Sequence, residues 1–358
     1  MPEKTLSKAA FLALVDALVA EGAQGGAQVV GVKRKRAGGD REVFDFGPLA
    51  AADELRLDYD VTLSPPKRYL QPPREALLKF TTGDAPAVEP VFDDAALVLI
   101  GVHPYDMVAI NQMDAVFNAD NPDQHYLRRR ANTTIICCNI QRAGRKAFAD
   151  QMGTTRVDSG FDLMLTDIGD AYVVTVGSEK GATLLDRAEG VADADADALA
   201  RRDAALDAGD ALYTENRLAC TAADIPDLLR PEAARDHDVW KEKSEKCFSC
   251  GSCNLVCPTC YCFDVQDEVT IDRTEGVRQR SWDGCLLAGF AAVATGENFR
   301  EERVERFQHR FYRKGLYLYD KFGQLFCVGC GRCATACLPD IANPVAVFNA
   351  LQEGGDQS

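Results

Sequence analysis

The feature that most constrains this chain is a run of cysteines that occurs twice. The first copy is CFSCGSCNLVCP at 247–258, and the second is CVGCGRCATACLP at 327–339. Both have the spacing C-x₂-C-x₂-C-x₃-C, a known pattern for holding [4Fe–4S] clusters. A cysteine at every third position of a tight loop directs three thiolates at one small cluster. The fourth cysteine, three residues further on, points in a different direction.

The fourth cysteines predict how two clusters share their ligands. In two-cluster ferredoxins the fourth cysteine of each run ligates the other cluster. We therefore predict two [4Fe–4S] clusters as the cofactors. The first is expected on Cys247, Cys250, Cys253 and Cys337, and the second on Cys327, Cys330, Cys333 and Cys257.

Zinc is the competing interpretation of these cysteines. Two C-x₂-C pairs hold a structural zinc ion, but each run here has four cysteines, the x₃ step and a proline at its end. Gly251 and Gly331 also suit a cluster, because they let backbone amides approach its sulfurs. The pattern therefore indicates iron–sulfur chemistry.

The remaining cysteines are also unevenly distributed. The chain has 14 cysteines, of which eleven fall between positions 247 and 337. This clustering is typical of a metal module with reduced thiols rather than of disulfides spread through a secreted domain. Three of the eleven, Cys260, Cys262 and Cys285, exceed the eight ligands that two clusters need. They either pack as small apolar groups, or form a third metal site or redox-active thiols.

Composition along the chain predicts an α+β protein in three parts. Residues 1–190 are expected to form a mixed α/β domain that docks a partner. Residues 191–215 are an acidic Ala/Asp-rich linker or helix, and 216–358 a mostly helical two-cluster ferredoxin-like domain.

The apolar pattern predicts the elements of the first part. Apolar residues from Phe11 to Val19 recur at helical spacing, which favours an amphipathic helix over a signal peptide. We also expect a Pro-rich loop over 64–73, a helix over 107–117 and a hairpin joining 163–166 to 171–176. Strands are expected at 28–32, 42–46, 55–61, 97–102 and 133–138. In the last strand Cys137 and Cys138 face opposite sides and are expected to be core thiols.

A long segment separates the two cysteine runs and combines a predicted helix with a basic stretch. The helix is expected over 284–295. Seven Arg and Lys residues follow between Arg300 and Lys321, against four acidic residues. They either offset the negative charge of a thiolate-bound cluster and raise its potential, or form a solvated helix face with i,i+3 and i,i+4 ion pairs.

A polar turn, His103-Pro104-Tyr105-Asp106, follows a predicted buried strand. One interpretation is a partner or ligand contact, because α/β folds bind ligands at the carboxyl ends of parallel strands. The other is a βα turn in which Asp106 caps the following helix.

Composition and missing motifs exclude several function classes. Lys and Arg number 40 against 55 Asp and Glu, a net charge of −15, so no nucleic-acid partner is expected. The longest apolar runs have eight residues, against about 20 in a spanning helix, so we predict no membrane span and a cytoplasmic location. The chain has no phosphate-binding loop, dinucleotide fingerprint, serine elbow or H-E-x-x-H motif. No catalytic residue is therefore predicted.

Segments around the cysteine runs resemble a known family. They are PPKRYL (65–70), GVHPYD (101–106), GFDL (160–163), TDIGD (166–170), GSEKG (177–181), CPTCYCFD (257–264), WDGC (282–285) and NFR (298–300). With these segments the chain is similar, over nearly its whole length, to the iron–sulfur beta subunit of cytoplasmic NiFe sulfhydrogenases, the hydrogenase/sulfur reductases. It also resembles the A subunit of anaerobic sulfite reductase.

The resemblance implies a non-catalytic electron-transfer subunit of an oxidoreductase complex of anaerobic metabolism. Such a subunit relays electrons between a flavoprotein that handles NAD(P)H and a catalytic redox subunit of the NiFe hydrogenase or sirohaem type. The alternatives are a subunit of anaerobic sulfite reductase or of another multi-subunit reductase, or a catalytic reductase that uses the extra cysteines. The chain departs from the family at Tyr105 and over 145–153, where it lacks cysteines that related chains often carry.

Overall fold

The N-terminal half of the chain is built on one eight-stranded mixed sheet. The computed structural model describes residues 1–35 and 42–355, so 36–41 and 356–358 of the two predicted domains lie outside the described residues. Strands β2, β6, β7 and β8 are parallel, and the full order is β10-β1-β9-β8-β7-β6-β2-β3. The bounds are β1 (Glu3–Ser7), β2 (Gln28–Lys35), β3 (Val43–Pro48), β6 (Leu97–Val102), β7 (Thr133–Cys138), β8 (Leu163–Asp167), β9 (Ala171–Val176) and β10 (Ala192–Asp193).

The sequence patterns predict most of this sheet correctly. Strands β2, β3, β6 and β7 are confirmed, as is the antiparallel hairpin of β8 and β9. Strand β6 is buried along its whole length, which explains why it reads as a continuous apolar run rather than an alternating one. Cys137 and Cys138 of β7 are both buried.

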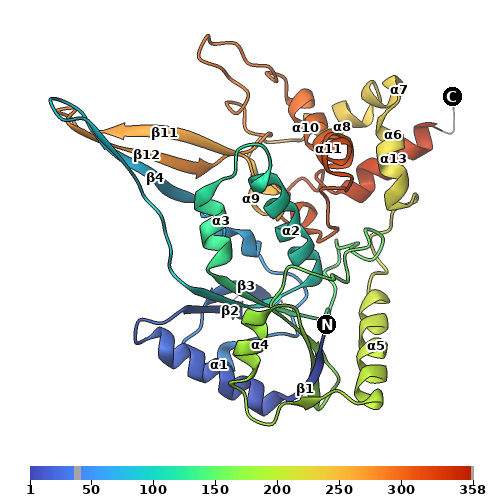
Figure 1. Ribbon diagram of the computed structural model, residues 1–358. Coiled ribbons are helices and arrows are strands. Elements are labelled where there is room, and N and C mark those ends of the chain that lie inside the picture. The colour runs from blue at the N-terminus through green and yellow to red at the C-terminus, as the bar shows by residue number, and fades with distance from the viewer. Residues whose placement is uncertain (36–41, 356–358) are drawn as a thin grey trace.

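Helices cover both faces of the sheet (Figure 1). Helices α1 (Lys8–Gly22) and α4 (Glu179–Leu185) lie on one side, and α2 (Pro104–Asn118) and α3 (Gln124–Ala131) lie on the other. Helix α1 begins where the Ser7 hydroxyl accepts a hydrogen bond from the Ala10 N–H at 3.1 Å. The helices predicted within 11–19 and 107–117 are therefore confirmed.

Two predicted elements are wrong. Residues 55–61 form turns after the short 3₁₀ helix η1 (Ala52–Glu54) instead of a strand. Leu55, Leu57 and Tyr59 are buried, so their alternation reflects packing against the sheet rather than strand pairing. Residues 284–295 are a series of turns instead of a helix. Gly284 packs so closely on Asn254 that a Cβ would come within 2.9 Å of it.

A second sheet forms an arm that projects from the molecule (Figure 1). Its antiparallel order is β11-β12-β4-β5, and none of its strands was predicted from the sequence. Strand β12 belongs to the segment between the two cysteine runs, and it pairs with β4 of the predicted N-terminal domain. The sheet therefore connects these two parts of the chain. The bounds are β4 (Arg74–Thr81), β5 (Ala87–Pro90), β11 (Phe263–Val269) and β12 (Glu275–Trp282).

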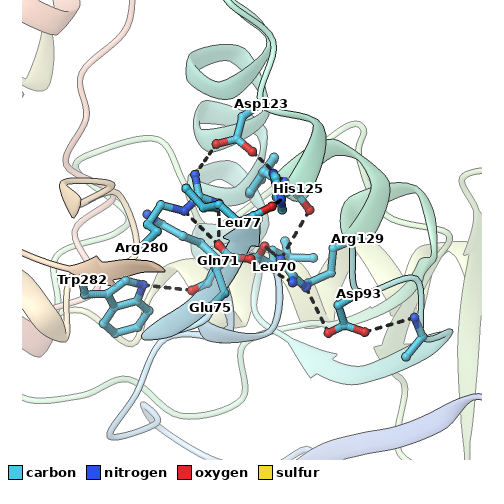
Figure 2. A network of polar contacts seen from close by, with 12 residues as sticks. Leu70, Gln71, Glu75, Leu77, Asp93, Asp123, His125, Arg129, Arg280 and Trp282 are labelled. Carbon is cyan, nitrogen blue, oxygen red and sulfur yellow. Dashed lines mark hydrogen bonds and ion pairs between the residues drawn. The ribbon is translucent and has the colours of Figure 1, made fainter. Parts of the chain in front are cut away.

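Buried ion pairs anchor the base of this arm to α3 (Figure 2). Arg280 of β12 lies between Glu75 of β4 and Asp123, the N-cap of α3. Glu75 also pairs with Arg129 of α3 at 3.0 Å. The two buried guanidinium groups therefore share the Glu75 carboxylate, and Asp123 supplies a second negative charge. Trp282 adds a hydrogen bond from its indole N–H to the backbone of the Pro-rich loop.

The C-terminal part is largely helical, as predicted, apart from β11 and β12. Its core packs the rings of Phe307, Phe311 and Tyr312 around Trp240 and includes cysteines of both runs. No helix in the described ranges is long and apolar enough to cross a membrane. The other helices are η2 (Pro66–Tyr69), α5 (Ala196–Asp210), η3 (Ala222–Asp224), α6 (Ile225–Leu229), α7 (Glu232–Arg235), α8 (Val239–Glu245), α9 (Ser252–Leu255), α10 (Arg303–Tyr312), the π-helical turn η4 (Arg313–Tyr317), α11 (Leu318–Phe322), α12 (Arg332–Thr335) and α13 (Pro344–Gly355).

Candidate iron–sulfur site

Two short helical turns present the cysteines of each run. Turn α9 follows Gly251, and α12 follows Gly331. The two glycines have φ of 72° and 75°, a left-handed conformation that costs glycine little. Each left-handed residue reverses the chain between the second and third cysteine of its run. The two runs therefore share one local fold.

The four cysteines of the first predicted cluster lie around one cavity. We name Cys247, Cys250, Cys253 and Cys337 the first thiol set; they line a space of about 150 Å³. Three come from the first run and one from the second, which is the crossed arrangement expected from the spacing. The structure brings these thiols together, and their ligation of a cluster stays a prediction.

The four cysteines of the second predicted cluster line a smaller cavity of about 30 Å³. We name Cys257, Cys327, Cys330 and Cys333 the second thiol set. Across residues 1–35 and 42–355, no three His, Cys, Asp or Glu side chains are close enough to share a single metal ion. Zinc would need its thiolates at about 2.3 Å from one atom. Neither thiol set therefore offers a ready single-ion zinc site in the described residues.

The two thiol sets differ in their surroundings. In the first set Cys250 is exposed, and the cavity is flanked by Phe248 and Leu338, which are 70% and 90% exposed. In the second set Cys330 belongs to a small core with Tyr105 and other residues that follow β6 and β7. The first set therefore lies near the surface, and the second lies against the carboxyl end of the large sheet.

Two glycines allow the second cysteine run to pack against the N-terminal domain. A Cβ on Gly329 would lie 2.7 Å from the backbone of Ala149, and one on Gly331 would lie 2.5 Å from that of Lys146. The Phe148 N–H donates a hydrogen bond to the Gly329 carbonyl at 2.7 Å. Backbone contact at this distance leaves no room for a side chain, so the run needs glycine at both positions.

The basic stretch divides into a buried and an exposed part. Arg306, Arg310 and Lys314 are spaced by four residues and are 6%, 2% and 8% exposed, whereas Lys321 is exposed and pairs with Asp120. Arg310 and Lys314 line the cavity of the second thiol set. The buried cations fit the first interpretation, which stays a prediction, whereas the pair of Lys321 with Asp120 is not an i,i+3 or i,i+4 pair.

The buried cations beside the second thiol set fit an anionic cluster. In the part of the chain that the structure describes, no carboxylate lies within 4.0 Å of Arg310 or Lys314, and Arg310 Nε has no hydrogen-bond partner. A buried cation without a counter-charge is costly, by about 3–5 kcal/mol when its partner is removed. Thiolates that carry an iron–sulfur cluster would supply that counter-charge.

The cysteines of the second set differ in pKa: burial raises the pKa of Cys327 to about 11 and that of Cys330 above its usual value, whereas the pKa of Cys257 is lowered. A hydrogen bond from the Cys260 thiol lowers the pKa of Cys257 well below its usual value, and Lys314 and Arg310 lower it further. Burial alone would lower the pKa of Lys314, but the sulfurs of Cys257 and Cys260 raise it above the usual value. Cluster ligands must be deprotonated, and among these three cysteines the surroundings favour the thiolate at Cys257.

A buried ion pair joins the second run to the N-terminal domain. Arg332, between Cys330 and Cys333, donates two hydrogen bonds of 2.6 Å to the carboxylate of Asp106. The predicted capping role of Asp106 is therefore wrong: His103 is the N-cap of α2, and Asp106 is fully buried. Asp106 is a residue whose role the sequence did not reveal, because its partner lies far along the chain.

His103 itself is part of the packed junction rather than an exposed contact. Its ring stacks on Tyr59 with centroids 3.9 Å apart, and its Nδ1 shares a hydrogen bond with the Tyr105 hydroxyl at 2.8 Å. Burial, and then the charge of Arg332, lower the pKa of His103 well below its usual value. The ring is neutral in the folded protein. Cys260, Cys262 and Cys285 lie outside the walls of both cavities.

Comparisons with known proteins agree with this geometry. A family model described as "4Fe-4S dicluster domain" matches residues 246–341, which include all eight predicted ligands. The chain is 34% identical, over 312 residues, to Sulfhydrogenase 2 subunit beta of Pyrococcus furiosus. The match covers 87% of this chain and 90% of the relative. No solved structure matches the chain.

The chain belongs to the sulfhydrogenase beta-subunit family. The resemblance stated from the sequence is thereby confirmed. The region that the family model matches contains both cysteine runs together with Arg310, Lys314 and Arg332. The α+β fold class is confirmed by the sheets and helices described above.

Proposed function

We propose that this chain is a non-catalytic electron-transfer subunit that holds two [4Fe–4S] clusters. The first thiol set would ligate one cluster and the second thiol set the other. The observation that carries the proposal is the crossed pairing of the thiols, in which each cavity is lined by three cysteines of one run and one of the other. When bound, each cluster supplies a one-electron couple whose potential depends on charge, hydrogen bonds and burial.

The residues around the two cavities give the sites different roles. Arg310 and Lys314 place two buried positive charges at the second thiol set, which raises the potential of a cluster there. Exposed Phe248 and Leu338 beside the first thiol set are suited to contact another protein. The chain would therefore exchange electrons with a partner through the first set and hold the second set inside.

The partners follow from the family. The relative is named as a subunit of sulfhydrogenase, so this chain would work in a multi-subunit complex. We infer a flavoprotein subunit linked to NAD(P)H on one side and a catalytic redox subunit, such as a NiFe hydrogenase, on the other. A cytoplasmic location fits this assignment and the reduced cysteines.

The test is to purify the chain without oxygen from its native cells and to identify the co-purifying proteins by mass spectrometry. A NiFe large and small subunit together with a flavoprotein would support the proposal. A sirohaem subunit would make the chain part of a sulfite reductase and keep the relay role. A chain that elutes alone and turns over a substrate would overturn the electron-transfer proposal in favour of catalysis at its extra cysteines.

A further inference from the structure

Three cysteines lie outside both cavities, and two of them face one buried amide. We name Cys260, Cys262 and Cys285 the third thiol group. The side-chain Nδ2 of Asn254 lies 3.6 Å from Cys260 Sγ and 3.4 Å from Cys285 Sγ. Asn254 is 1% exposed, and an amide N–H that points at two sulfurs is suited to thiolates. Two thiols from distant positions therefore share one donor.

The hairpin of the arm brings the third cysteine to the same place. Cys262 immediately precedes β11, and Cys285 lies three residues after β12. These strands pair with Phe263 opposite Trp282, and the Asp283 N–H donates a hydrogen bond to the Cys262 carbonyl at 3.1 Å. The base of the hairpin thus fixes Cys262 beside the loop that carries Cys285.

A buried lysine points at this group. Lys67 of η2 is 3% exposed, donates a hydrogen bond to the Cys260 carbonyl, and places Nζ 4.4 Å from the centroid of the Trp282 ring. Within residues 1–35 and 42–355, no carboxylate lies within 4.0 Å of its Nζ. Lys67 lies in the PPKRYL segment, which is far from Cys260 in the sequence.

Burial lowers the pKa of Lys67, and the sulfurs of Cys260 and Cys257 oppose that shift. Burial of an unpaired ammonium group is unfavourable unless it is paired or neutralised, and neutral thiols do not supply a counter-charge. Thiolates do, and buried thiolates are stable when they ligate a metal. The second thiol set likewise has two buried cations, Arg310 and Lys314, in the wall of its cavity.

We propose that Cys260, Cys262 and Cys285 hold a third metal centre of the iron–sulfur class, with Lys67 as its counter-charge. In the described part of the chain these three thiols do not form a ready single-ion site, and neither do the two thiol sets. The group also adjoins both sets, because Asn254 directly follows Cys253 and the Cys260 N–H donates a hydrogen bond to the Cys257 carbonyl at 3.4 Å. A centre here would lie within the same electron-transfer module. This inference goes beyond the two clusters of the proposed function.

The test is the metal content of the full chain, produced without oxygen together with an iron–sulfur assembly system. Iron, acid-labile sulfide and zinc are measured per chain by elemental and colorimetric analysis. Three [4Fe–4S] centres give about twelve irons, against about eight for two. Cys285→Ala and Cys260→Ala should each contain about one third less iron than the wild type. Lys67→Met should also contain less iron, or should lose that third of the iron more readily.

Controls separate this proposal from its alternatives. Cys137→Ala removes a buried thiol of β7 and should leave the iron content unchanged. Wild-type chain with about eight irons would overturn the third centre and keep the proposed function, whereas a chain without iron would overturn both. One zinc ion per chain that is lost in Cys285→Ala would also overturn the iron–sulfur assignment. The iron content of the wild type by itself distinguishes two centres from three. A variant that fails to fold therefore does not obscure the result.

Discussion

The ion pair of Asp106 and Arg332 provides the sharpest prediction about the junction of the two parts. Arg332 is 2% exposed and Asp106 is fully buried. Arg332 also donates hydrogen bonds to the carbonyl and hydroxyl of Thr62, at 2.9 and 2.7 Å. The change Asp106→Asn keeps the size of the side chain and removes its charge. The guanidinium then remains buried without a counter-ion, between two cysteines of the second thiol set.

The expected loss of stability can be estimated. Removal of one partner from a buried ion pair costs about 3–5 kcal/mol. An unfolding entropy of about 2.1 cal/mol/K per residue gives about 0.75 kcal/mol/K for a chain of this length, so Tm should fall by about 4–7 °C. The assay is anaerobic thermal unfolding of the holoprotein, followed by circular dichroism. Release of iron to a chelator should also be faster, because Arg332 holds the loop of Cys330 and Cys333.

Two comparisons make this prediction decisive. The double change of Asp106→Leu and Arg332→Met replaces the pair by apolar groups and should recover at least half of the lost stability. Arg145→Ala breaks an exposed pair with Glu215 and should leave Tm unchanged. A Tm of Asp106→Asn within about 1 °C of the wild type would refute the buried-charge reasoning.

Three further predictions concern other buried charges. Arg310→Met should lower the midpoint potential of the cluster on the second thiol set by about 50–100 mV. The reason is that a unit charge at about 8 Å is worth about 2 kcal/mol at an effective dielectric constant of 20. A potentiometric titration that shows no shift would contradict this. Glu75→Ala leaves Arg280 and Arg129 without their shared carboxylate and should cost about 3–5 kcal/mol in denaturant unfolding, whereas the more exposed Asp93 should be replaceable by Ala with little effect. Burial lowers the pKa of His103 below 6.5. As the pH falls below that value, the imidazole of His103 therefore binds a proton in the unfolded chain but not in the folded one. This one residue should lower the free energy of unfolding by up to about 1.4 kcal/mol for each unit that the pH falls. In His103→Asn the plot of unfolding free energy against pH should be flatter between pH 7 and 5.5.

The sequence predicts elements whose signal is local. The spacing of the two cysteine runs is enough to propose eight ligands and their crossed pairing, because the geometry of a cluster restricts which cysteines can meet. The strands β6 and β7 are predicted because burial on both faces requires continuous apolar residues. Helix α1 is predicted because its buried residues recur at helical spacing.

Features that depend on distant partners were missed. The strands of the arm are exposed along most of their length, so they lack the apolar signal of a core strand, and β4 pairs with β12 from far along the chain. Asp106 is read as a helix cap when only its neighbours are known, and its true partner, Arg332, lies in the other part. The helix predicted over 284–295 is also absent: the segment forms turns, and Gly284 at its start packs against Asn254 from the first cysteine run.

The most direct measurement of the central claim is an anaerobic redox titration followed by electron paramagnetic resonance. It compares Cys250→Ala, Cys337→Ala and Cys330→Ala with the wild type, after reduction of each holoprotein in steps. If the chain holds one-electron clusters on crossed ligands, Cys337→Ala changes the same signal as Cys250→Ala and leaves the signal that Cys330→Ala changes. The account is contradicted if Cys337→Ala changes the Cys330 signal instead, or if the wild type shows no reducible iron–sulfur signal.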